Sequence, residues 1–113
     1  YIGDDCLFSW DINFRTSDGH TILDLNTQKP LNLPRDIKIG SNVWIGESVK
    51  LLKGASIPDN SVVGAYSLVT KNYQEPNVII AGHPAKVVKR NIRWDRQNPV
   101  TFSTKSSENS QND

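Results

Sequence analysis

The stretch that decides the fold is residues 39–71, IGSNVWIGESVKLLKGASIPDNSVVGAYSLVTK. Steps of six along it meet an aliphatic residue every time: Ile39, Ile45, Leu51, Ile57, Val63 and Val69. A second column, two residues earlier, passes from aliphatic to small side chains: Ile37, Val43, Val49, Ala55, Ser61 and Ser67. A glycine or proline follows four of the six residues of the first column. Such regularity predicts a repeat architecture.

A period of six fits neither common secondary structure, because helices repeat every three to four residues and strands every two. It suits a solenoid in which each hexapeptide forms one short flat side and a small residue turns the corner. One aliphatic side chain per side then points to the axis. The sequence therefore predicts an all-β, parallel β-helix. The alternation within each repeat leaves a β-sandwich as the alternative fold.

The same spacing continues upstream through Ile2, Phe8 and Phe14, and the next step lands on His20, where the apolar column stops. Residues 21–36 break the phase and contain two prolines, which predicts a loop that leaves the coil. Loops that interrupt a rigid scaffold often carry function. Downstream of the array we expect a short strand at 78–80. Residues 85–96 should form a short helix or a last strand.

Composition limits the classes of function. Thirteen Lys and Arg against twelve Asp and Glu give a net charge of +1 and no reason to expect nucleic acid. No apolar run is long enough to span a membrane. The single cysteine favours a reducing, cytoplasmic compartment. We interpret the chain, which starts at Tyr1 and has no methionine, as lacking its N-terminal coils, with a domain at 1–96 and a disordered tail at 97–113.

Three segments together resemble a known family: residues 39–71, AGHPAKVVK at 81–89, and RTSDGHTILD at 15–24. They resemble the hexapeptide-repeat acyltransferases of the galactoside/maltose O-acetyltransferase type. The polysaccharide branch, which acetylates sialic acid polymers, is the most similar. The resemblance covers residues 1 to about 95. It implies a left-handed coil and a homotrimer with active sites between subunits. It also implies acetyl-CoA as the donor, a sugar or polysaccharide hydroxyl as the acceptor, and no metal.

His20 is the leading candidate for the catalytic base, because acyl transfer to a hydroxyl needs a group that takes the hydroxyl proton near neutral pH. It also matches the catalytic histidine of the family. Asp18, Asp24 or a backbone carbonyl could hold the imidazole tautomer, and Asp18 fits the acidic residue of the polysaccharide branch. The alternatives are a solvated loop histidine and two ordinary turn aspartates. We expect His83 to be a surface residue.

Trp44 lies between two glycine corners, so its ring should point outward, toward a ligand or a subunit interface. In the family a tryptophan at this place lines the acetyl-CoA channel. The resemblance extends the donor-binding set to Gly46, Ala65, Ser67, Thr70, Lys71, Pro84, Lys86 and Lys89. We expect an oxyanion-binding backbone N–H near Trp44 or Gly46. Glu47 departs from the small residue of many relatives and would crowd or polarise the channel.

Three other functions share parts of this pattern. A non-catalytic binding or structural domain would keep the hexapeptides but would need neither His20 nor Trp44. Zinc carbonic anhydrases of the same coil need three histidine ligands, and the chain has two, which excludes them. A nucleotidyltransferase would require a nucleotide-binding domain upstream of Tyr1.

Overall fold

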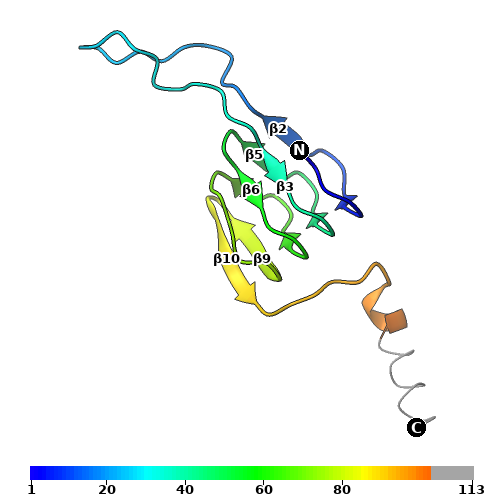
Figure 1. Cartoon of the computed structure of the whole chain (residues 1–113). Helices are drawn as coiled ribbons and strands as arrows, with labels where there is room; N and C mark the ends of the chain where they lie inside the picture. Colours follow the sequence, from blue (N-terminus) through cyan, green and yellow to red (C-terminus); the bar gives the residue numbers. More distant parts are fainter. Residues whose placement is uncertain (103–113) are drawn as a thin grey trace, which may run out of the picture.

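The chain winds into a coil with three flat sides, each a small sheet whose strands are parallel except for β10 at the end of one of them (Figure 1). The computed structural model describes residues 1–102. One side holds β1, β4, β7, β9 and β10, the second holds β2, β5 and β8, and the third holds β3 and β6. The strands are β1 (Leu7–Phe8), β2 (Asn13–Arg15), β3 (Lys38–Ile39), β4 (Trp44–Ile45), β5 (Lys50–Leu52), β6 (Ser56–Ile57), β7 (Val62–Val63), β8 (Leu68–Val69), β9 (Val78–Gly82) and β10 (Ala85–Arg90).

The register between strands confirms the period of six. Residues that pair across successive windings are 18 apart, as in Ile39 with Ile57 and Ile45 with Val63, which is three hexapeptides per turn. All six aliphatic residues of the main column are 0–1% exposed, and the residues of the second column are 0–5% exposed. Parallel pairing throughout the array excludes the sandwich. The coil is the left-handed parallel β-helix, opposite in hand to most parallel β crossovers.

The corners of the coil repeat with the same period. Five residues spaced by six have left-handed backbone angles, with φ between 56° and 81°: Asn42, Ser48, Gly54, Asn60 and Tyr66. Asparagine and glycine adopt this region readily, whereas serine and tyrosine pay a steric cost there. The inter-winding hydrogen bonds at these corners, such as that from Tyr66 N–H to the Glu47 carbonyl at 2.8 Å, hold the turn in place.

The upstream apolar residues that are spaced by six also belong to the coil. Ile2, Phe8 and Phe14 pair with Ile39, Ile45 and Leu51, so each extends the main column by one winding. Here the partners are 37 residues apart instead of 18, because an arm of 19 residues is inserted between β2 and β3. The arm projects from the coil as an irregular hairpin (Figure 1). It is closed by hydrogen bonds from Arg35 N–H to the Thr16 carbonyl and from Leu31 N–H to the Ile22 carbonyl.

The C-terminal part ends the coil with a hairpin. The strand expected at 78–80 is the centre of β9, and β10 pairs with it in antiparallel fashion, so the last element is a strand rather than a helix. The chain then folds back along the coil, and residues 99–102 form a helical turn. Most of the tail predicted at 97–113 lies outside the described residues. No helix within residues 1–102 has the length and apolar character that a bilayer crossing requires.

Truncating the main column tests this architecture. Ile57, which is 1% exposed at the centre of the array, pairs with Ile39 of the preceding winding. Ile57→Ala should lower the free energy of unfolding by about 2–5 kcal/mol, because it leaves a cavity that the coil cannot close. Urea denaturation at fixed protein concentration measures the change. The matched control is Lys38→Ala at the exposed position of β3, expected within about 0.5 kcal/mol of wild type. Equal losses in both variants would contradict the buried column.

Candidate active site

His20 lies in the arm, not in the coil. The arm departs at Thr16, directly after β2, so the histidine sits a few residues out from the scaffold. It lines a shallow pocket between the two sides of the hairpin, together with Ser17, Pro30 and Leu33. The side chain is exposed, and within residues 1–102 its imidazole forms no hydrogen bond. The ring is therefore accessible to a substrate that approaches the arm.

Neither aspartate that flanks His20 holds its ring. The Asp18 carboxylate accepts hydrogen bonds from the Lys53 ammonium and from Asn32 Nδ2 at 2.9 Å. These contacts, first Lys53 and then Asn32, lower the pKa of Asp18. Asp24 stands at the tip of the arm, where Oδ1 accepts the N–H groups of Thr27 and Asn26, each at 2.8 Å. Those two backbone donors lower the pKa of Asp24. Both carboxylates thus shape the arm.

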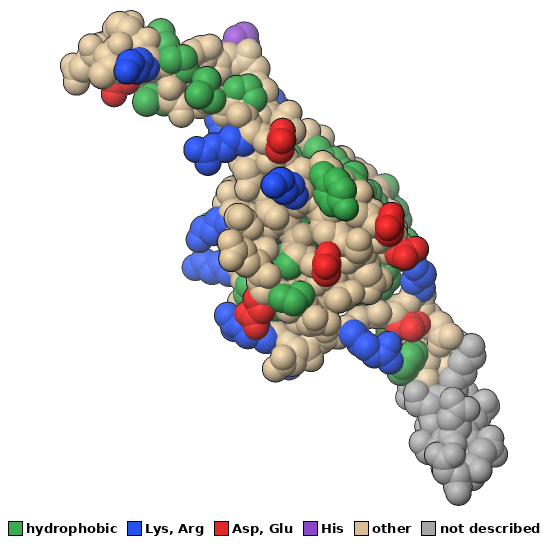
Figure 2. Space-filling view, viewed as in Figure 1, with side chains coloured by type: hydrophobic (Ala, Val, Ile, Leu, Met, Phe, Trp, Pro, Cys, Tyr) green, Lys and Arg blue, Asp and Glu red, His purple; other side chains and the backbone are tan. Residues whose placement is uncertain are grey.

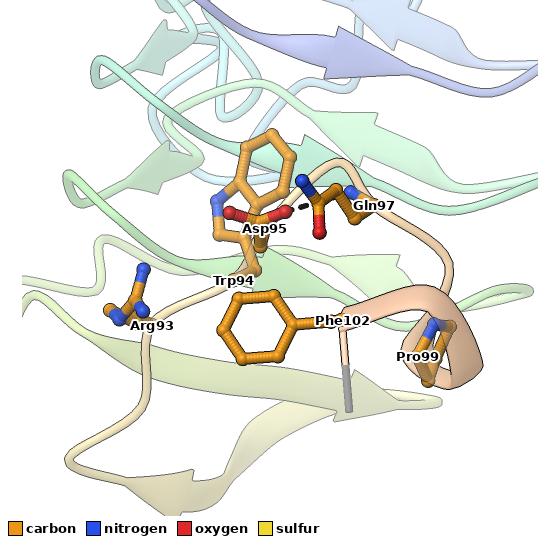
Figure 3. Close-up of a pocket in the computed structure, with 6 residues that line it drawn as sticks. All are labelled: Arg93, Trp94, Asp95, Gln97, Pro99 and Phe102. Atoms are coloured by element: carbon orange, nitrogen blue, oxygen red, sulfur yellow. Dashed lines mark hydrogen bonds between the residues drawn. The ribbon is translucent and has the colours of Figure 1, made fainter. Parts of the chain in front are cut away.

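Trp44 lies on β4 and is 39% exposed, so its ring faces outward as expected. Trp94 from the C-terminal segment covers one side of the ring, with centroids 6.0 Å apart and planes inclined by 47°. Trp94 is fixed because its Nε1–H donates to the Asn42 carbonyl at 2.7 Å. Figure 3 shows the Trp94 indole above the Phe102 ring, both lining one pocket of the C-terminal segment. The exposed part of Trp44 therefore belongs to an aromatic surface of two elements.

One chain does not bring His20 and Trp44 together. The arm leaves the coil at the corner between the sheet of β2, β5 and β8 and the sheet of β3 and β6. Trp44 belongs to the remaining sheet, which is the side of the triangle opposite that corner. A site that uses both side chains must therefore combine two copies of the chain.

Several of the predicted donor-binding residues follow one edge of the coil, the corner that comes after β4, β7 and β9. Gly46 and Ala65 stack there in successive windings, and a Cβ on Gly46 would lie 2.7 Å from Ala65 N. Pro84 is exposed in the turn that follows β9 at the next level. Because Trp44 begins the same side, these four residues mark a line parallel to the coil axis. An extended ligand could lie along such an edge.

Other residues of the predicted set lie elsewhere. Thr70 and Lys71 follow β8 at the corner from which the arm departs, and both are exposed. Lys86 and Lys89 are exposed on β10. Their ammonium groups are therefore free to meet an anionic group. Within the part of the chain that the structure describes, no group of three or more His, Cys, Asp or Glu side chains is placed to hold a metal ion.

Ser67 differs from the other predicted donor contacts because its side chain is inside the coil. It is 2% exposed, and its hydroxyl donates to the Gly64 carbonyl at 2.7 Å and accepts from Gly82 N–H at 3.2 Å. The hydroxyl cannot bind a ligand while it makes these bonds.

The expected oxyanion donors are also engaged. The N–H groups of Trp44 and Gly46 donate to carbonyls of the next winding, Ser61 at 3.0 Å and Val63 at 2.9 Å. These two groups are therefore not free to bind an oxyanion, and an oxyanion-binding N–H elsewhere near them stays a prediction. Glu47 neighbours this edge, and its Oε1 accepts from Trp10 Nε1–H at 3.0 Å, which turns the carboxylate toward the N-terminal winding. His83 is exposed, as expected.

Sequence reasoning missed three side chains that contact candidate residues. Lys53 pairs with Asp18, Asn32 bonds the backbone around His20, and Trp94 covers Trp44. Asn32 lies between two prolines and reads as an ordinary loop residue. Trp94 is 50 residues from Trp44 and lies beyond the repeat. No repeat spacing in the sequence links the two residues of any of these pairs, so the sequence could not predict the contacts.

Known proteins share both the repeat and the shape. Residues 36–71 match the family described as bacterial transferase hexapeptide (six repeats). A polysialic acid O-acetyltransferase from Escherichia coli O1:K1 / APEC is 46% identical over 96 residues, which is 84% of this chain and 31% of that protein. The chain spans about a third of that relative's length, and about half of each of the two structures that follow.

Two solved structures resemble the coil. The crystal structure of the polysialic acid O-acetyltransferase OatWY has a TM-score of 0.85 at 40% identity and covers 96% of this chain and 52% of that one. A galactoside acetyltransferase in complex with coenzyme A has a TM-score of 0.66 at 31% identity, with 83% and 52% covered. The similarity to the first structure includes the arm as well as the coil, because nearly the whole chain is aligned.

The ion pair at the base of the arm has a measurable consequence. Removing the ammonium with Lys53→Met should raise the pKa of Asp18 toward that of a free aspartate, about 4. A lowered folded-state pKa stabilises the folded state above about pH 4, and this stabilisation disappears as the pH falls through the folded value. Carboxyl-detected NMR titration measures the change.

Two controls accompany this titration. Asp24 should keep its pKa in Lys53→Met, because backbone N–H groups set it. Lys50→Met replaces a lysine of β5 itself, which does not pair with Asp18, and should leave the pKa of Asp18 lowered. An Asp18 pKa that is the same in wild type and Lys53→Met would show that the pair does not form.

Proposed function

Since this chain belongs to the hexapeptide-repeat family of bacterial transferases, we propose that it transfers an acetyl group from acetyl-CoA to a hydroxyl of a sugar or polysaccharide. The observation that carries the proposal is the exposed His20, whose imidazole is unbound on an arm otherwise tied by hydrogen bonds. The named activities of the relatives supply the donor and the class of acceptor. A cytoplasmic location belongs to the same proposal.

In the proposed reaction the neutral imidazole of His20 takes the proton of the acceptor hydroxyl as its oxygen attacks the thioester carbonyl. The C–O bond forms and a tetrahedral oxyanion results. Its collapse breaks the C–S bond, and the imidazolium returns the proton to the departing sulfur. The products are the acetyl ester and coenzyme A. No metal takes part in this scheme.

The donor is proposed to lie along the edge marked by Trp44, Gly46, Ala65 and Pro84. The outward face of Trp44 offers an apolar wall for the acetyl-thioester end. Thr70, Lys71, Lys86 and Lys89 remain in the proposed set, with the lysines as charge partners for phosphate groups. For Ser67 only the backbone stays in the proposal, because the hydroxyl is bound inside the coil.

A homotrimer is part of the proposal. His20 and Trp44 lie on opposite sides of one coil, so a shared site needs a neighbouring copy. The arm supports the same conclusion, because Figure 2 shows hydrophobic side chains along its length. Five of them are 50–88% exposed: Ile22, Leu23, Leu25, Leu31 and Leu33. An apolar projection of this size is expected to pack against another surface. A closed ring of three gives each arm the same neighbour.

Replacing His20 tests the mechanism. His20→Ala should lower the turnover of acetyl transfer more than about 10²-fold, since no other base stands at the same place on the arm. Coenzyme A release, measured with a panel of sugar acceptors, reports the rate. His83→Ala, the matched control at the other exposed histidine, should retain the wild-type rate. A normal rate in His20→Ala would remove this residue from the mechanism. A stable trimer that never transfers acetyl would favour the non-catalytic structural alternative.

Mixed trimers test whether the site is shared. His20→Ala and Trp44→Ala should each be impaired alone, because every site then lacks one group. Co-expressed with two different tags and purified through both, the variants should recover activity. Purification through both tags leaves only mixed trimers, in which about a third of the sites obtain His20 from one chain and Trp44 from its neighbour. Mixed trimers with no more activity than the single variants would place both residues in the same chain's site.

A further inference from the structure

Asn32 makes more contacts to the His20 segment than any other side chain of the arm. It lies on the returning side of the hairpin and is half-buried in an arm that is otherwise almost fully exposed. Its Nδ2 donates to the His20 carbonyl at 2.8 Å and to Asp18 Oδ2 at 2.9 Å. Its Oδ1 accepts from Ile22 N–H at 2.7 Å. One amide thus binds residues 18, 20 and 22, on both sides of the histidine.

These bonds are connected to the coil. Asp18, one of the partners of Asn32, also accepts from the Lys53 ammonium, and Lys53 directly follows β5. The amide orientation is set by its surroundings, because the nitrogen faces two oxygens and the oxygen faces an N–H. The rigid scaffold, the ion pair and the amide therefore form one continuous path to the backbone of His20. The imidazole itself stays outside this network.

We propose that Asn32 is a positioning residue for His20, fixing the backbone on either side of the histidine so that the free imidazole faces the acceptor hydroxyl. This inference rests on the proposed function. Asn32 does not touch the reacting atoms. Its effect follows from geometry, because a general base must lie within hydrogen-bond reach of the proton that it removes. A displacement of about 1 Å can cost on the order of 10²-fold in rate.

Two substitutions of similar size remove the contacts in different ways. Asn32→Asp keeps the acceptor for Ile22 N–H, loses both donors and places a second carboxylate against Asp18. Asn32→Leu removes all three hydrogen bonds. Asn26→Ala is the matched control, because it changes an arm asparagine whose side chain has no part in this network.

The experiment measures kcat, the KM for acetyl-CoA and the amide exchange rate of Ile22 in each variant. In Asn32→Asp and Asn32→Leu we expect kcat to fall about 10- to 100-fold, while the KM for acetyl-CoA stays within about twofold, since the hydrogen bonds of the Asn32 amide go to residues 18, 20 and 22 of the arm and to none of the proposed donor-binding residues. Faster exchange of the Ile22 amide is expected in Asn32→Leu, because its acceptor is gone. Asn26→Ala should match wild type in all three quantities.

The outcomes separate this inference from the function on which it rests. Wild-type protein without acetyl transfer would overturn the proposed function. An active wild type whose kcat survives Asn32→Leu, with the Ile22 amide released, would overturn the positioning role alone. A trimer that dissociates, or a KM that rises together with the loss of kcat in both variants, would show a structural role for Asn32 and would also overturn it.

Discussion

Side chains six residues apart meet in one interior line, and the rest of the molecule depends on that contact. Each winding of the array contributes three aliphatic residues to the axis, and Ile39, Ile45 and Leu51 each pair with the aliphatic residue 18 positions later. No hexapeptide could bury its apolar residue alone, so the windings stabilise one another. The close spacing also limits the corners, where a Cβ on Gly40 or Gly46 would lie under 3.0 Å from the next winding. The result is a stiff rod with short, fixed sides and well-defined edges.

This scaffold explains how an irregular arm can hold a defined position, as the proposed role of His20 requires. The 19-residue insertion within residues 16–36 leaves the coil without disturbing the register, because Phe14 and Ile39 still align with their columns on either side. The arm has almost no core of its own, and hydrogen bonds around Asp18, Asn32 and Asp24 give it shape. Its apolar side chains remain uncovered in one chain. The coil thus sets the directions of the arm and of Trp44, and in one chain those directions diverge.

The sequence predicted the coil well because the relevant interaction is periodic. Ile2, Phe8 and Phe14 could be assigned to the column across the insertion by spacing alone, and their pairing confirms it. The choice between helix and strand after Pro84 stayed open, because antiparallel pairing with β9 is not a feature of the repeat.

The side-chain contacts of the candidate site could not be predicted from the sequence. The Asn32 amide, the Lys53–Asp18 pair and the Trp94–Trp44 contact join residues 12 to 50 positions apart through side-chain geometry that no local pattern encodes. The burial of the Ser67 hydroxyl, likewise, follows from the position of Gly82 in the next winding.

The central claim is that the coil separates an imidazole from an indole within one chain and that assembly reunites them. A crystal structure of the protein with bound coenzyme A tests this most directly. The account predicts that the sulfur lies between His20 of one chain and Trp44 of its neighbour, with the pantetheine arm running along the edge of Gly46, Ala65 and Pro84. A sulfur bound far from His20, or flanked by His20 and Trp44 of a single chain, would contradict it.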